Sequence, residues 1–366
     1  MTTTATDRIY NFSAGPGVLP DEVIHQAQAD LWNIDNSGMG IMEHSHRAKV
    51  YDRIIAEAIA DCRAVGNISD DYAVLFMTGG ASSQNHLIPA NLLPEGGTAD
   101  YINTGHWATK TIKECQYYGN AHVAFDGKAS DFTFIPTRDE IHYSENPAYV
   151  HYTSNNTIMG TQFRQAPEVP SGVPLVCDMC SDIYSEPIDV SKFGLIYAGA
   201  QKNLGPAGTT LVIVRKDLLE AAPRPLPTMM SYKVFAEKES RPNTPPVFPI
   251  YVVGLVFKWI LAQGGLEPIA QRNSAKARII YDAIDASDFY TGHAREDSRS
   301  LMNIAFRSPS PDLDKKFLAE ALAEGMDNLK GHRSIGGMRA SVYNAFPAQG
   351  CEVLAQFMRE FERKNG

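Results

Sequence analysis

The sequence is poor in the features on which membrane, secreted and nucleic-acid-binding proteins depend. No stretch approaches the roughly 18 uninterrupted apolar residues of a transmembrane helix, and the opening MTTTATDRIYNF has no apolar leader segment. Positive charge is scarce, because 33 Lys and Arg face 42 Asp and Glu and leave a net charge of −9. That balance disfavours broad binding to nucleic acid or anionic membranes. With only 5 scattered cysteines, we expect reduced thiols, a cytoplasmic location and small-molecule partners.

The sequence that is present alternates short β-rich runs with amphipathic stretches, a pattern typical of an α/β fold with a mainly parallel sheet. The predicted strands are Tyr72–Met77, Asp100–Asn103, Ala121–Phe125, Ala148–Tyr152, Val173–Cys177, Leu195–Ala198 and Thr209–Val214. The predicted helices are Asp21–Trp32, Ala48–Gly66, Ile250–Gly264, Pro268–Ile284 and a last helix through Phe357–Arg363.

Two composition changes suggest the domain organisation. Between Pro223 and Pro249 the chain is so rich in proline that it cannot be regular throughout, and so long a segment is usually functional or covers a partner. From about Asp285 the pattern changes to that of a smaller α+β unit. A chain of 366 residues is also long enough for two domains.

Lys202 is the residue that says most about chemistry. It lies in LIYAGAQKNLGPAGTTLVIVR, after an apolar strand that ends in small residues, and its neighbours in sequence offer no carboxylate partner. Burial lowers the pKa of such an amine and makes it a nucleophile for carbonyl carbons, as in Schiff-base lysines. A surface lysine that caps a strand is the alternative, and the flanking segments must decide between them.

Asp178 and Trp107 are candidates for contacts with a heteroaromatic ring. Asp178 follows the apolar run GVPLVC, where a carboxylate needs a cation such as a protonated pyridine nitrogen, although a helix cap would also explain it. Trp107 follows a glycine turn, from which its indole could stack on a ring or simply pack in the core. The separation of 24 residues from Asp178 to Lys202 holds one further predicted strand, which is compatible with adjacent strands that place both side chains at one sheet edge.

Two further segments bear on which ligands the protein binds. Thr78–Gln84, TGGASSQ, joins a strand to an apolar stretch and could present backbone N–H groups to a phosphate, although it lacks the dinucleotide and P-loop spacings. Cys177 and Cys180 form a CxxC pair, but no second pair completes a zinc site. We therefore expect two incidental buried thiols and no metal.

Cationic residues gather in two places despite the acidic composition. EHSHRAK contains His44, His46 and Arg47, and KGHRSIGGMRAS contains Lys330, His332, Arg333 and Arg339. Arginine binds carboxylate or phosphate with two parallel hydrogen bonds, so the two clusters suit recognition of a dianion. Solvated surface charge is the alternative for each cluster alone.

Taken in order, these segments resemble the phosphoserine aminotransferases, class-V members of the fold-type I pyridoxal-phosphate enzymes. The matching motifs span nearly the whole chain: NFSAGP, MEHSHR, TGGASSQ, GHWA, NNTIMG, the Asp178 segment, YAGAQKNLGPAG, NTPP and KGHRSIGGMRASVYNA. The resemblance implies a homodimer whose large domain, residues 16–265, holds a mainly parallel seven-stranded sheet. Residues 266–366 and the N-terminal arm, residues 1–15, would form a small α+β domain.

The resemblance also assigns roles to individual residues. Lys202 would hold pyridoxal 5'-phosphate as a Schiff base and move the α-proton, Asp178 would pair with the ring nitrogen, and Trp107 would stack on the ring. Thr157 would contact the phenolic oxygen. The cofactor phosphate would be held by Ala81, Ser82 and Gln201, with Asn243 and Thr244 of the other subunit.

For substrates, the resemblance implies exchange of an amino group between glutamate and 3-phosphohydroxypyruvate, which yields phosphoserine for serine biosynthesis. Some bacterial members also act on phosphohydroxythreonine in vitamin B6 synthesis. Arg339 would bind the α-carboxylate. His46 and Arg47 would bind the side-chain anion, with His332 and Arg333 reaching from the partner chain.

One departure and three alternatives stay open at this point. Ser82 stands where some family members have an arginine, which leaves the phosphate site one cation lighter. A serine or alanine–glyoxylate aminotransferase would keep Lys202 and Asp178 without needing the paired cationic clusters. A cysteine desulfurase would need a mobile cysteine, for which only Cys351 lies near the end of the C-terminal domain. A cofactor-free binding protein would be colourless when purified.

Overall fold

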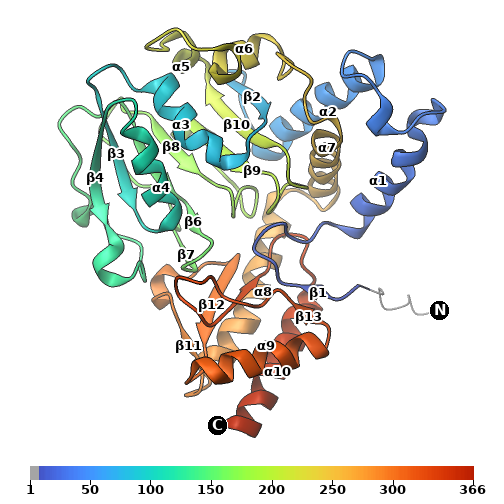
Figure 1. Cartoon of the computed structure of the whole chain (residues 1–366), viewed down its shortest axis with the longest axis vertical. Coiled ribbons are helices and arrows are strands. Elements are labelled where there is room, and N and C mark those ends of the chain that lie inside the picture. Colours follow the sequence, from blue (N-terminus) through green and yellow to red (C-terminus); the bar gives the residue numbers. More distant parts are fainter. Residues whose placement is uncertain (1–7) are drawn as a thin grey trace.

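A seven-stranded sheet forms the centre of the molecule in the computed structural model, which describes residues 8–366 (Figure 1). Its strands, in spatial order, are β2 (Tyr72–Met77), β10 (Thr210–Arg215), β9 (Leu195–Gly199), β8 (Leu175–Asp178), β5 (Val150–Thr153), β3 (Thr98–Asn103) and β4 (Asn120–Asp126). β10 runs antiparallel to both of its neighbours, and the other neighbouring pairs are parallel. The predicted α/β fold with a mainly parallel seven-stranded sheet is therefore confirmed.

Helices cover both faces of this sheet because successive strand residues point to opposite sides. On one face, Phe76 of β2 belongs to the core that includes side chains of α2 (Lys49–Gly66) and α7 (Val247–Ala262). On the other face, Leu75 packs with side chains of α3 (Gly80–Leu92) and α4 (His106–Cys115). All six residues of β2 are buried, as expected of a strand covered on both faces.

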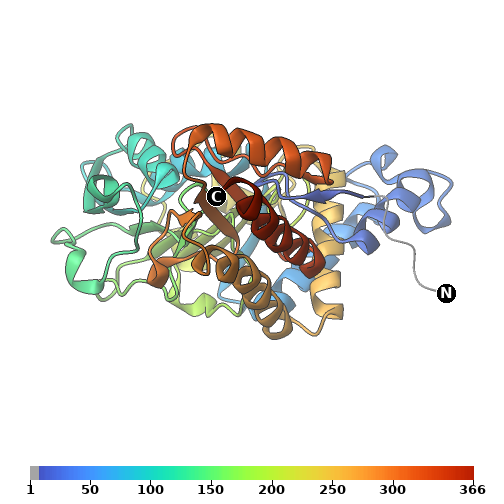
Figure 2. The ribbon, with the colours of Figure 1, turned by 90° about the horizontal axis from the view of Figure 1, so that it is seen from below.

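The C-terminal part has its own sheet and core. The three-stranded antiparallel sheet consists of β11 (Thr291–Gly292), β12 (Asn303–Arg307) and β14 (Met338–Ser341), and the helices that pack on it are α8 (Leu266–Asp285), α9 (Pro311–Ala323) and α10 (Ala348–Asn365). Viewed from below, these orange and red elements lie in front of the large sheet (Figure 2). The boundary between residues 265 and 266 stays a prediction.

The N-terminal segment joins the C-terminal part. β1 (Tyr10–Asn11) pairs in parallel with β13 (Met326–Asp327), and the buried Phe12 belongs to the same core as α8 and α10. Residues 1–7 of the predicted N-terminal arm lie outside the described residues.

The remaining elements are short. The strands β6 (Asn155–Asn156) and β7 (Thr161–Gln162) form a hairpin, and the helices α5 (Lys216–Glu220) and α6 (Tyr232–Glu237) precede α7. The 3-10 helices are Ile34–Asn36, Ile41–Glu43, Gly127–Ser130, Arg138–Glu140, Val190–Lys192, Thr228–Met230 and Glu296–Ser298. The proline-rich stretch Pro223–Pro249 thus holds only α6, one 3-10 turn and the start of α7.

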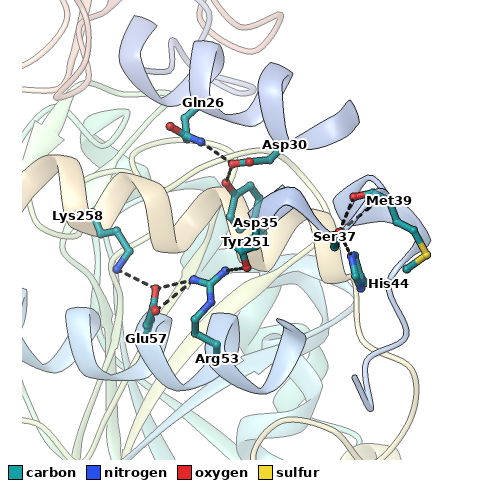
Figure 3. A network of polar contacts seen from close by, with 10 residues as sticks. All are labelled: Gln26, Asp30, Asp35, Ser37, Met39, His44, Arg53, Glu57, Tyr251 and Lys258. Carbon is teal, nitrogen blue, oxygen red and sulfur yellow. Dashed lines mark hydrogen bonds and ion pairs between the residues drawn. The ribbon is translucent and has the colours of Figure 1, made fainter. Parts of the chain in front are cut away.

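A polar network fastens helix α1 (Asp21–Asn33) to α7 (Figure 3). The buried Asp30 carboxylate accepts hydrogen bonds from Gln26 Nε2, at 2.7 Å, and from the Tyr251 hydroxyl. Nearby, Lys258 Nζ lies 3.1 Å from Glu57 Oε2, which links α7 to α2. Because the buried carboxylate has hydrogen-bond donors, the network costs little free energy of burial and fixes where α1 lies.

Helix α7 is strongly apolar, but its surroundings explain this. Within residues 8–366 no single helix is both long and apolar enough to cross a membrane, and only α7 and α8 together, bent by 90°, meet that test. Most side chains of α7 pack in the core on the α2 face of the sheet.

Candidate active site

A cavity of about 140 Å³ lies where the carboxyl ends of β5, β8 and β9 meet the N-termini of α3 and α4. Ligands in open α/β sheets bind at this edge. The cavity is lined by Gly80, Ala81, Ser82, Asn85, Trp107, Thr153, Asn155, Thr157, Asp178, Cys180, Ser181, Gln201 and Lys202. Seven of the nine predicted cofactor contacts therefore meet in one place: Ala81, Ser82, Trp107, Thr157, Asp178, Gln201 and Lys202.

Lys202 lies three residues beyond β9, and its side chain is buried. Its Nζ donates a hydrogen bond to Thr157 Oγ1 at 2.6 Å and lies 5.6 Å from the centroid of the Trp107 ring. Burial lowers the pKa of Lys202, while the neighbouring Cys180 and Asp178 oppose that shift. A lowered pKa favours the unprotonated form of an amine, which is the form that attacks a carbonyl carbon.

Asp178 is the last residue of β8 and pairs in register with Thr153 of β5 and Tyr197 of β9. Its carboxylate is buried, and Oδ1 accepts a hydrogen bond from the Cys180 backbone N–H at 2.9 Å. Since β8 and β9 are neighbours, the strand ends bring Asp178 and Lys202 to the same cavity.

The N-terminus of α3 forms one wall of the cavity. Gly79 and Gly80 have φ values of 89° and 66°, which place both in the left-handed region. A Cβ atom on Gly79 would lie only 1.9 Å from Ser83 Oγ, so this turn requires glycine. The turn directs the first N–H groups of the helix, those around Ala81 and Ser82, towards the cavity, where they favour an anion.

Arg339 on β14 reaches the same region from the C-terminal part. Its Nη1 donates a hydrogen bond to the Thr157 backbone carbonyl at 3.2 Å, and burial lowers its pKa. Thr157 therefore accepts hydrogen bonds from both Arg339 and Lys202.

His332 lies near the start of helix α4 in the single chain. The His332 ring lies 5.8 Å from the His106 ring of the same chain, and His106 in turn lies 5.3 Å from the Trp107 ring. The loop that carries His332 closes on itself through the bridge between Lys330 and Met338. His332 does not itself line the cavity, so its predicted role at a partner's site stays a prediction.

Arg333 lies next to His332 in the same loop, and its predicted contact with a partner's site also stays a prediction. Its charge contributes to lowering the pKa of His106 and of His332, after the larger effect of burial, so its guanidinium lies near both rings in one chain. Arg333 is exposed and does not line the cavity itself.

Four predicted residues lie away from this cavity in the single chain. His46 and Arg47 lie in the exposed turn before α2, with Arg47 Nε 3.5 Å from His46 Nε2. Asn243 and Thr244 are exposed before α7. None of the four lines the cavity.

Several cavity residues were not predicted. Thr153 and Asn155 follow the predicted strand Ala148–Tyr152, so the rule that placed Asp178 would also have indicated Thr153. Cys180 was interpreted as an incidental thiol, and it is free, buried and accepts a hydrogen bond from the Gly199 N–H with its sulfur at 3.2 Å. Within residues 8–366, no group of three His, Cys, Asp or Glu side chains is arranged to hold a metal ion.

Three buried polar atoms around the cavity have no partner within the protein, namely Trp107 Nε1, Thr153 Oγ1 and Arg339 Nε. Buried donors are rarely left unpaired, so these atoms indicate a polar ligand. A nucleophilic amine, a carboxylate, an indole ring and an anion-binding helix terminus fit an aromatic aldehyde that carries a phosphate. The residues present therefore suit pyridoxal phosphate.

Comparisons with known proteins agree with this geometry. The "Aminotransferase class-V" family matches residues 9–354. A phosphoserine aminotransferase of Desulfatibacillum aliphaticivorans is 54% identical over 362 residues, which cover 98% of this chain and 99% of that protein.

Two solved structures extend the comparison. A phosphoserine aminotransferase from Bacillus circulans subsp. alkalophilus is 50% identical with a TM-score of 0.96, and the match covers 99% of this chain and 100% of that one. A PLP-bound phosphoserine aminotransferase from Trichomonas vaginalis is 38% identical with a TM-score of 0.90, over 96% and 100% of the two chains. The chain belongs to the class-V aminotransferase family.

Proposed function

We propose that this protein catalyses pyridoxal-phosphate-dependent transfer of the amino group of glutamate to 3-phosphohydroxypyruvate, which yields phosphoserine for serine biosynthesis and 2-oxoglutarate. The observation that carries the proposal is the buried Lys202 amine, 2.6 Å from Thr157 Oγ1 in a cavity that it shares with Asp178 and Trp107. The 54% identity to a phosphoserine aminotransferase supports the same activity.

The cofactor site uses the groups that line the cavity. Pyridoxal phosphate, when bound, supplies an electron sink for the charge left on Cα after its proton is removed. Asp178 would accept a hydrogen bond from the ring nitrogen and keep it protonated, and Trp107 would cover the ring. The N–H groups of Ala81 and Ser82 and the Gln201 side chain bind the phosphate.

Lys202 has two tasks in this proposal. Its amine would hold the cofactor and, once free of it, would take the proton from the substrate Cα and pass it to the cofactor carbon that carries the amino group. Burial lowers the pKa of Lys202, which favours the unprotonated amine that this task needs. Thr157 orients the amine through the hydrogen bond already present.

The substrate contacts divide between the α-carboxylate and the side chain. Arg339 binds the α-carboxylate that glutamate and phosphoserine share, while His332 and Arg333 bind the side-chain anion. Histidine beside arginine can serve both a carboxylate and a phosphate, because its hydrogen bonding adapts to either. With Ser82 in place of a cation, recognition of the substrate phosphate depends chiefly on the arginines.

We further propose a homodimer in which each subunit completes the other's site. His46, Arg47, Asn243 and Thr244 lie away from the cavity of their own chain, and they would contribute to the partner's cofactor and substrate sites. We place the enzyme in the cytoplasm, a location that suits five free and buried cysteines.

The test is a product analysis of the purified enzyme with glutamate and a panel of keto acids. We expect phosphoserine and 2-oxoglutarate in equal amounts from 3-phosphohydroxypyruvate, and much slower turnover of hydroxypyruvate and glyoxylate. Arg333→Ala should lose turnover of the phosphorylated acceptor by at least about tenfold, while the exposed control Arg359→Ala should not. Equal turnover of glyoxylate, undiminished in Arg333→Ala, would instead support a glyoxylate aminotransferase.

A further inference from the structure

A buried ammonium group lies at the junction between the two sheets. Lys276 on α8 is only 2% exposed, and its Nζ donates hydrogen bonds to the backbone carbonyls of Val342 at 3.0 Å and Tyr343 at 2.6 Å. A third, longer bond reaches the Asn344 carbonyl at 3.5 Å. An ammonium has three N–H donors, so three consecutive carbonyls use all of them.

A positive charge on Lys276 is costly in free energy, because the side chain is buried. No carboxylate of residues 8–366 forms an ion pair with it, and burial lowers the pKa of Lys276 to about 7. An apolar side chain of similar length would fill the space without that desolvation cost. The hydrogen bonds to the carbonyls are therefore what a lysine provides here and a methionine would not.

The segment 342–344, whose carbonyls bind Lys276, is connected at its N-terminal end to the substrate site. Val342 directly follows β14, which carries Arg339, and Arg339 Nη1 lies 3.2 Å from the Thr157 carbonyl at the cavity. The Val342 N–H donates to the Met302 carbonyl at 2.8 Å, which holds the same segment against the C-terminal sheet.

The other end leads to the loop of Lys202. The Asn344 backbone N–H donates to Oδ1 of Asn203, the residue after Lys202, at 3.0 Å, and Asn344 Nδ2 donates to the Tyr184 carbonyl at 2.8 Å. One turn before Lys276 on α8, Asn273 Nδ2 donates to Asn344 Oδ1 at 2.8 Å. Asn203 and Asn344 are both buried.

We propose that Lys276 is a positioning residue for the reaction: by binding the carbonyls of residues 342–344, it fixes the strand of Arg339 relative to the loop of Lys202. A substrate held at its carboxylate by Arg339 must present its α-carbon to the Lys202 amine, so the distance between these two side chains decides how productively it binds. This inference rests on the proposed transamination, and it assigns a role to a residue that touches neither cofactor nor substrate.

The test compares Lys276→Met with Arg278→Met, an exposed position on the same helix that serves as the matched control. Methionine keeps the length and the apolar stem but cannot donate. Because Arg339 serves both substrates, we expect the KM values for glutamate and phosphoserine to rise together, by roughly tenfold or more. The visible absorbance of the bound cofactor should stay, because Lys202 and Asp178 are untouched, and Arg278→Met should behave as the wild type.

Kinetics at a temperature well below Tm separate positioning from simple stabilisation. A Lys276→Met enzyme with a lower Tm but wild-type KM values for both substrates would overturn the proposal. Should Lys276→Met fail to fold, Asn344→Ala tests the proposal instead. It removes the side-chain hydrogen bonds to Asn273 and Tyr184 at the C-terminal end of the segment 342–344. The same joint rise in KM is expected there, and unchanged KM values would overturn the inference. Wild-type enzyme that does not convert phosphoserine at all would instead contradict the proposed function.

Discussion

The chemistry of the molecule depends on how one amine is surrounded. Lys202 has a hydroxyl partner in Thr157, an indole face in Trp107 and a carboxylate nearby in Asp178, all within a buried cavity. Burial lowers its pKa, and the carboxylate limits that shift. The result is an amine that can act as a nucleophile and as a base in the same place.

Replacing Lys202 should therefore remove two functions at once. In Lys202→Ala we expect loss of covalently held cofactor and a decrease in turnover of at least about 10²- to 10⁴-fold, because no other buried amine faces the cavity among its lining residues. Reduction with borohydride followed by mass spectrometry measures the first, and steady-state kinetics the second. Lys216→Ala, at the exposed start of α5, is the control. A fully active Lys202→Ala enzyme would contradict the assignment.

The burial of Lys276 should make the stability of the protein depend on pH. The pKa of Lys276 is lowered from 10.5 to about 7 in the folded protein. Between these values the unfolded chain binds the proton and the folded chain does not, so the contribution of Lys276 to stability rises as the pH increases from about 7 towards 10.5. The stability of the wild type relative to Lys276→Met should thus increase, on the order of 1–3 kcal/mol from pH 7 to pH 9.

Urea unfolding of both proteins at pH 7 and pH 9 measures this difference. Subtracting the free energy of unfolding of the variant from that of the wild type at each pH cancels the contributions of the other titrating groups. A stability difference that stays constant or falls with pH would show that Lys276 keeps its ordinary pKa.

At the scale of elements, the turn before α3 is the most constrained part of the site. Gly79 combines a φ of 89° with a Cβ position 1.9 Å from Ser83 Oγ. Gly79→Ala should weaken cofactor binding by roughly tenfold and lower the free energy of unfolding by about 1–2 kcal/mol, through backbone strain and a displaced helix terminus.

Gly96→Ala is the matched control, because Gly96 has a φ of 70° but nothing within 4 Å of its added Cβ. It carries the strain without the collision and lies away from the cavity lining. Titration of apo-protein with pyridoxal phosphate and thermal unfolding compare the two variants. Equal cofactor affinity in Gly79→Ala and Gly96→Ala would refute the role given to this turn.

The secondary-structure elements were the part of the structure that the sequence predicted best. Apolar runs bounded by glycine and proline located each strand of the large sheet within a few residues, and β2 was predicted without error as Tyr72–Met77. The spacing of Asp178 and Lys202 was compatible with adjacent strands that end at one edge, and the pairing of β8 with β9 confirms this, whereas the order of the seven strands was not predicted. The position of the His332 ring beside His106 could not be predicted, because it depends on how the loop between Lys330 and Met338 packs. No local pattern in the sequence encodes that tertiary contact.

At the scale of the whole molecule, the charges are distributed over two separate regions. His332, Arg333 and Arg339 belong to the C-terminal part, where Arg339 contacts Thr157 at the cavity, whereas His46 and Arg47 lie in the turn before α2. In the proposed homodimer the two regions meet across the interface. The dianion site would then exist only in the dimer.

Mixed dimers test this arrangement. Lys202→Ala and Arg47→Ala subunits should each be nearly inactive alone, but a mixed dimer would have one site that carries both defects and one intact site. Unfolding and refolding an equimolar mixture should restore roughly a quarter of wild-type activity, since half of the dimers are mixed and each has one working site. Activity that stays at the level of the separate variants would place Arg47 in its own chain's site or in none.

The most direct test of the central claim is the visible spectrum of the purified protein during each half-reaction. The account predicts an absorbance near 410 nm, about where a protonated pyridoxal Schiff base absorbs. It should be lost on adding phosphoserine alone and, in a separate sample, on adding glutamate alone, and 3-phosphohydroxypyruvate and 2-oxoglutarate should appear in amounts equal to the enzyme. A colourless protein, or a spectrum that alanine changes and phosphoserine does not, would contradict it.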